Sequence, residues 1–122
     1  MTRLELQADP SAARRTRSWL REQLAAVTLP TQVRQTLELL ATELVTNAVR
    51  HGGEPIEVRL HHLEGAVRVS VSDGGSGRPL VRHVPPTATG GRGVALVDTL
   101  AHRWGLDPDG AGKTVWFELP LG

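Results

Sequence analysis

The order of the apolar patterns along the chain constrains its fold more than any other feature. Apolar residues recur at helical spacing in two successive segments, and Gly52-Gly53 closes the second, longer one. Beyond these glycines, apolar residues alternate with polar ones at residues 56–60 and again at residues 67–71, as in strands with one buried face. The pattern therefore predicts two helices followed by two adjacent strands.

Short local patterns predict further structural features of the N-terminal half. Leu4 and Leu6 alternate with charged residues, which indicates a short edge strand. Asp9 is expected to be the N-cap of the first helix, with Pro10 at its first helical position. Pro30 separates the two helices, since proline cannot continue a helix from within.

The C-terminal half adds a loop, a third helix and a last pair of strands. Residues 78–89 contain three prolines and show no regular period, which is typical of a lid or a disordered loop. Helical spacing returns over residues 91–101, and residues 103–107 and 114–119 are expected to pair as strands. Half-polar strands imply a sheet with helices on one face, so the expected fold is an α/β protein, a two-layer α/β sandwich.

The composition limits the protein class. A chain of 122 residues fits one domain, taken as residues 1–122, and it has no cysteine for a disulfide or a thiolate metal site. No apolar run approaches the roughly 20 residues that cross a bilayer, and charged residues interrupt the N-terminus, so we expect no membrane contact and a cytoplasmic location. A net charge of +1 gives no general attraction for nucleic acid.

A carboxylate and a carboxamide share one face of the second predicted helix. Glu43 and Asn47 lie four residues apart, which places them one turn from each other. The amide oxygen of Asn47 suits Mg²⁺ that also holds phosphates, and Glu43 could orient or deprotonate a nucleophile. Arg50 could reach a phosphate and His51 a sugar or base. For the pair alone, a solvated polar stripe is the simpler interpretation.

An acid followed by glycines comes directly after the second predicted strand. Asp73 precedes Gly75 and Gly77, which allow the backbone to approach a ligand closely. A carboxylate at a strand end can accept a hydrogen bond from the exocyclic amine of adenine. The alternative is an ordinary turn, because Asp-Gly is a common turn dipeptide.

A third segment opens the helix predicted after the loop. The residues Gly91, Arg92, Gly93 and Val94 place paired glycines where unpaired backbone N–H groups attract phosphate. A Rossmann fingerprint would need another glycine where Leu96 stands, and the Gly-Lys-Ser/Thr triplet of a P-loop does not occur. The histidines show no zinc-binding spacing. Together, the three segments point to ATP.

In this order and at this separation, the segments at residues 43–51, 73–77 and 91–94 resemble the nucleotide-binding boxes of the GHKL ATPase/kinase superfamily. Within it, the chain looks most like bacterial anti-sigma-factor serine kinases, and residues 103–105 and 112–116 agree with that likeness. The resemblance implies a Bergerat fold, with a mixed, mostly antiparallel sheet and helices on one face.

The resemblance also implies roles for single residues. Glu43 would be the catalytic base that activates a partner's serine, Asn47 would hold Mg²⁺, and Asp73 would bind adenine. The glycine segment at residues 91–94 would hold the phosphates beneath a lid at residues 78–89. Thr114 matches a position near the adenine pocket. ATP and Mg²⁺ are therefore the expected cofactors.

Similar proteins bind a sigma factor and phosphorylate a small antagonist protein, and many of them are homodimers. Four arginines near the start of this chain could meet an acidic sigma surface, although a plain solvated helix face is the simpler interpretation: Arg14, Arg15, Arg17 and Arg21. Two alternatives to a kinase stay open. The domain could bind ATP and a partner without transferring phosphate, or it could be a structural domain that has lost ATP binding.

Overall fold

The computed structural model describes residues 1–74, 97, 100–109 and 112–121. The elements in this part of the chain follow the order β1 (Thr2–Leu6), α1 (Ala12–Gln23), α2 (Thr31–Asn47), the π-helix η1 (Ala48–Gly52), β2 (Ile56–Leu63), β3 (Ala66–Asp73), β4 (Arg103–Asp109) and β5 (Gly112–Pro120). The predicted lid at residues 78–89 lies outside the described residues. Of the helix predicted over residues 91–101, Val97 and Leu100 are described and helical.

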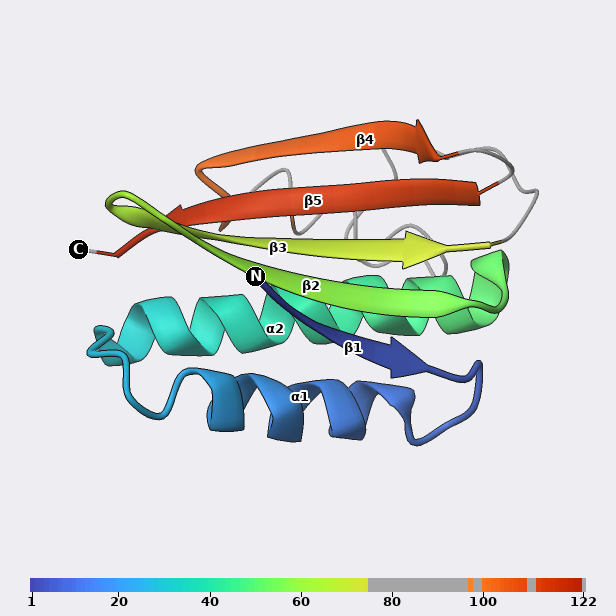
Figure 1. Ribbon diagram of the computed structural model, residues 1–122, viewed down its shortest axis with the longest axis horizontal. Helices are drawn as coiled ribbons and strands as arrows, with labels where there is room; N and C mark the ends of the chain where they lie inside the picture. The colour runs from blue at the N-terminus through green and yellow to red at the C-terminus, as the bar shows by residue number, and fades with distance from the viewer. Residues whose placement is uncertain (75–96, 98–99, 110–111, 122) are drawn as a thin grey trace.

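The five strands form one sheet in the order β1-β2-β3-β5-β4. All four pairings among the described strands are antiparallel, and α1 and α2 both lie on one face of the sheet (Figure 1). β1 is an edge strand, as predicted, and the turn between β2 and β3 falls at Gly65, whose φ is 73°. The structure therefore confirms the predicted two-layer α/β sandwich.

The first helix begins two residues later than predicted. Its N-cap is Ser11, so the prediction of Asp9 as N-cap is wrong. The Asp9 carboxylate accepts hydrogen bonds from the backbone N–H and the hydroxyl of Ser11, and its carbonyl accepts one from Ala12 N–H at 3.1 Å. These bonds close a turn over Asp9, Pro10 and Ser11 ahead of the helix. The Ser11 hydroxyl, followed by the Ser11 backbone N–H, lowers the pKa of the Asp9 carboxyl.

The hydrophobic core lies between the helices and the sheet. α1 buries residues that recur every fourth position, and its arginines 14, 15 and 17 are exposed. α2 buries Leu37, Leu40 and Leu44 against alternate residues of the strands, such as Val69 and Phe117. Each such side chain contributes about 1.5–3 kcal/mol on burial. This apolar layer fixes which residues of each strand face the helices.

The opposite side of the sheet, which we call the open face, is polar. Alternate strand residues point to opposite sides, so this face carries the residues between the core positions: Glu57, Arg59, Arg68, Ser70, Ser72, Thr114, Trp116 and Glu118. Ion pairs join Glu57 to Arg59 and Arg68 to Glu118. In the described part of the chain, no helix has the length and apolar character required to cross a bilayer.

Candidate functional site

The C-terminal half of α2 carries the predicted helix pair. Glu43 and Asn47 are both half-buried, one turn apart on one flank of the helix. Glu38 lies on another flank, where its Oε1 forms an ion pair with Nη2 of Arg21 in α1 at a distance of 2.9 Å. Steps of about 100° per residue place Glu38 opposite Asn47. The Glu43–Asn47 flank therefore faces away from α1.

Beyond Asn47 the helix widens into the π-turn η1. Such turns are rare and frequently mark functional sites. Arg50 and His51 belong to η1 and are exposed, so both side chains can meet a ligand or a partner. η1 ends at Gly52, and Gly53 has a φ of 139° that favours glycine. The prediction that these two glycines close the second helix is confirmed.

At the end of β3, the Asp73 carboxylate is buried on the helix-facing side of the sheet. Its side chain is only 4% exposed, although a charged carboxylate normally stays in water. Lys113 of β5 lies directly across from it, with Nζ 3.3 Å from Oδ2. The lysine side chain is 14% exposed, so both charges are largely removed from solvent.

Glycines surround Asp73 because a larger side chain would not fit. A Cβ on Gly52 would lie 2.6 Å from Asp73 Oδ2 and 2.7 Å from Oδ1, and one on Gly112 would overlap the Asp73 carbonyl oxygen. A Cβ on Gly74 would lie 2.6 Å from the carbonyl oxygen of Glu54. These close approaches require residues without a side chain.

A backbone hydrogen bond ties the end of the helix to the end of β3. Gly74 N–H donates to the carbonyl oxygen of Gly53 at 3.1 Å. The structure thereby brings η1, with Arg50 and His51, next to Asp73 at the same end of the sheet. Two of the three predicted sequence segments therefore meet in space. The residues of the two glycine-containing segments that were predicted to contact the nucleotide lie outside the described residues: Gly75, Gly77, Gly91, Arg92, Gly93 and Val94.

Thr114 is not brought together with the Asp73 carboxylate. Its hydroxyl lies 2.7 Å from that of Ser72, on the open face, since neighbouring residues of a strand point to opposite sides. The side chain that β5 places beside Asp73 is Lys113, which the sequence analysis did not select. The signal was available: Val115 and Phe117 predict the buried side of β5, and Lys113 has the same parity.

The residues at this end fit Mg-ATP by their chemistry. The Asn47 amide oxygen is a suitable ligand for Mg²⁺, which is usually held by few protein groups together with phosphate oxygens. In the described part of the chain, no three side chains among His, Asp and Glu gather as a metal site.

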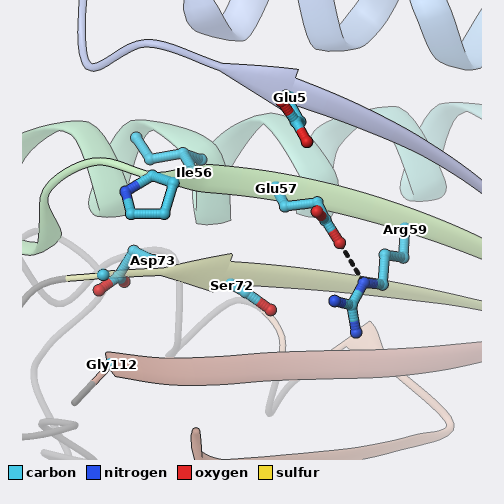
Figure 2. A pocket seen from close by; sticks show the side chains of 9 residues that line it. Glu5, Ile56, Glu57, Arg59, Ser72, Asp73 and Gly112 are labelled. Atoms are coloured by element: carbon cyan, nitrogen blue, oxygen red, sulfur yellow. Dashed lines mark hydrogen bonds and ion pairs between the residues drawn. The ribbon is translucent and has the colours of Figure 1, made fainter. Parts of the chain in front are cut away.

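A pocket of about 480 Å³ lies on the open face and reaches the end of the sheet, where Asp73, Gly74 and Gly112 line it. Glu5, Glu57, Arg59 and Ser72 line its remaining part, and Figure 2 shows the ion pair between Glu57 and Arg59 of β2. Glu5 and Glu57 are direct cross-strand neighbours, so two carboxylates border the pocket. Their charges repel phosphates, so this part of the pocket is a poor place for the phosphates of a nucleotide.

Comparison with known proteins identifies the family of this chain. A family model described as "Histidine kinase-like ATPase domain" matches residues 6–119. An uncharacterized protein of Streptomyces coelicolor is 38% identical over 79 residues, which cover 61% of this chain and 75% of that protein.

Solved structures share the fold. The crystal structure of the RsbU and RsbW domains of Rv1364c from Mycobacterium tuberculosis matches 99% of this chain at a TM-score of 0.74 and 25% identity. This chain spans 33% of that longer one. The catalytic domain of the histidine kinase ThkA matches 99% of this chain and 97% of its own length, at a TM-score of 0.58 and 20% identity.

Proposed function

Because the chain belongs to the family of histidine kinase-like ATPase domains, we propose that it binds Mg-ATP and transfers the γ-phosphoryl group to a serine of a partner protein. ATP binding follows from membership in a family of ATPase domains. The serine acceptor, the metal and the partner are the proposed steps. They rest on the residues gathered between α2 and the end of β3.

The observation that carries the proposal is the buried carboxylate of Asp73. It lies on the helix-facing side of the sheet, against Gly52 at the end of η1. Withdrawing a carboxylate from water is costly unless it gains strong partners. Beside the ammonium group of Lys113, adenine offers a further partner in its exocyclic amine, which donates to a carboxylate. Asp73 therefore fixes the base, and the side of the site that faces α2 and η1 receives the sugar and phosphates.

Residues of α2, of η1 and of the glycine segment at residues 91–94 would bind the phosphates. Asn47 would hold Mg²⁺ through its amide oxygen, and the ion, when bound, supplies charge neutralisation of the phosphates. Arg50 would pair with a phosphate, and His51 would line the sugar or base. Six residues outside the described part of the chain complete the proposed site: Gly75 and Gly77 at the base, and Gly91, Arg92, Gly93 and Val94 at the phosphates.

Glu43 is the proposed general base for transfer. It accepts the proton of the partner's serine hydroxyl while the serine oxygen bonds to the γ-phosphorus. The bond from that phosphorus to the bridging oxygen breaks, and ADP leaves. Glu43 and Asn47 share one half-buried flank of α2, which supports their acting on the same phosphate. The opposite flank is covered by α1.

The proposed partners are a sigma factor, which the domain sequesters, and a small antagonist protein, which it phosphorylates. The sequence likeness to anti-sigma-factor serine kinases supports this choice, as does the 25% identity with a protein that contains an RsbW domain. The exposed arginines of α1 give a basic surface for an acidic partner. We also propose a homodimer, on the same likeness.

A capture and transfer experiment tests the proposal. The purified protein is used to capture partners with and without Mg-ATP, and each captured protein is then incubated with γ-labelled ATP. We expect a phosphoserine on one partner, identified by mass spectrometry. Glu43→Gln should reduce transfer by at least about a hundredfold and leave ATP affinity within twofold. Thr42→Val, at the half-buried position next to Glu43 on the same helix, is the matched control.

The outcomes separate the candidate functions. Phosphate transfer that survives Glu43→Gln would remove Glu43 from the mechanism. A partner that binds only with ATP and is never phosphorylated would make the domain a nucleotide-dependent binding module. A protein that binds no Mg-ATP at millimolar concentration would contradict both.

A further inference from the structure

Lys113 is held beside the carboxylate that we assign to adenine. Nζ lies 3.3 Å from Asp73 Oδ2, and the two residues are direct partners in the pairing of β3 with β5. Lysine side chains usually extend their ammonium group into water. Here only 14% of the side chain is exposed, so the ammonium group remains close to the proposed base site.

The backbone fixes this position. Gly112 packs so closely on the Asp73 carbonyl oxygen that no Cβ could be accommodated there. The start of β5 is therefore pressed against the end of β3, and the Lys113 side chain emerges on the same side as the Asp73 carboxylate. An acceptor and a donor then stand next to each other at one end of the sheet.

The acceptor and the donor of this pair are complementary to the donor and the acceptor on one edge of adenine. Adenine carries a donor, the exocyclic amine, next to an acceptor, the ring nitrogen N1. A carboxylate can accept several hydrogen bonds, so Asp73 can serve Lys113 and an amine together. We propose that Lys113 is a base-recognition residue whose ammonium group donates to N1 of adenine while Asp73 accepts from the amine. This inference rests on the proposed ATP site.

A purely structural ion pair would behave differently. It would stabilise the protein, and its loss would weaken every purine nucleotide alike. A lysine that donates to N1 is sensitive to one ring atom of the ligand. The nucleotide 1-deaza-ATP replaces N1 with a C–H group and keeps the amine, so it isolates that contact.

The experiment is a calorimetric titration of the whole chain with Mg-ATP and Mg-1-deaza-ATP. We expect the wild-type protein to bind 1-deaza-ATP at least about tenfold more weakly, since a hydrogen bond from a charged donor is lost. Lys113→Met, of similar length and without charge, should bind the two nucleotides equally. Lys113→Arg should restore part of the difference, because it keeps a charged donor.

A third nucleotide separates this inference from the proposed site. Purine riboside triphosphate keeps N1 and lacks the amine, so it should bind more weakly than ATP to wild type and to Lys113→Met, because both proteins lose the contact to Asp73. Equal wild-type affinity for ATP and 1-deaza-ATP would overturn the role of Lys113 and leave the ATP site standing. The absence of any ATP binding would overturn both. Should Lys113→Met fail to fold by circular dichroism, the wild-type ratio alone decides.

Discussion

Two buried carboxylates on neighbouring strands have very different surroundings. Asp73 of β3 lies on the helix side of the sheet and Glu118 of β5 on the open face, with side chains 4% and 7% exposed. Glu118 Oε1 accepts from Nε of Arg68 at 3.1 Å and from its Nη2 at 2.7 Å. Its other oxygen lies 3.7 Å from Nε of Arg103.

The kind of neighbour distinguishes a binding site from a structural contact. Guanidinium groups occupy both oxygens of Glu118, and Arg68 also stacks on Trp116 at 4.2 Å from the ring centroid. Around Asp73 stand glycine backbones and the ammonium group of Lys113. A buried carboxylate alone does not indicate ligand binding. A carboxylate packed against glycines at a strand end favours ligand binding, because glycines leave more room for a ligand than residues with side chains.

The largest expected effect separates the two carboxylates directly. In Asp73→Asn, the amide oxygen is drawn to the Lys113 ammonium group, so the amide N–H₂ meets the adenine amine and two donors oppose each other. We expect ATP affinity to fall about a hundredfold or more by calorimetric titration. Glu118→Gln is the matched control and should keep wild-type affinity. Equal losses in both variants would contradict the distinction.

A smaller effect is expected from the glycine packing. In Gly52→Ala, the new Cβ would overlap the Asp73 carboxylate and displace it. We expect about a tenfold loss of ATP affinity and about 1–3 kcal/mol of stability by urea unfolding. Gly65→Asn is the control, since that turn has open space and asparagine tolerates its positive φ. Unchanged ATP affinity in Gly52→Ala would remove this glycine from the site.

On the open face, the expected effect is on stability alone. Arg68→Met leaves Glu118 with one distant cation and removes the stacking on Trp116. We expect a loss of about 1–2 kcal/mol in the free energy of unfolding, reduced by the partial exposure of Arg68. ATP affinity should stay within twofold. A parallel fall in affinity would show that the two faces are coupled.

The smallest effect concerns pH. Burial lowers the pKa of His61 on β2, with further contributions from the N-terminal ammonium group, Arg68 and Arg59. A histidine with a lowered pKa in the folded state favours unfolding as it takes up a proton. Its contribution is present above its ordinary pKa of 6.5 and is lost as the pH falls below that value. His61→Gln should therefore lose less stability than wild type between pH 7 and pH 5.

Urea unfolding at the two pH values measures this difference. His62→Gln, at the exposed neighbouring position, is the matched control. A His61→Gln protein that loses as much stability as wild type would assign the pH dependence to other groups.

The fold was predictable from the sequence because periods of 3.6 and 2 distinguish helices from half-buried strands. Local details depended on contacts that periodicity does not contain. Asp9 closes a turn through Ser11, so the helix begins later than its proline suggested. Thr114 was selected by likeness to a motif, whereas the pairing of β3 with β5 places Lys113 beside Asp73. The part of the site that can be tested by geometry is the part where α2, η1 and β3 meet.

The hydrogen bond from Gly74 to Gly53 has a consequence for how this protein can diverge. Gly52 and Gly74, at the corner that this bond closes, admit no added carbon atom, so mutation there is penalised whatever nucleotide is used. Lys113 is the neighbour that can change without moving the main chain. New ligand preferences in this lineage should therefore arise by exchange of that one side chain on an invariant frame.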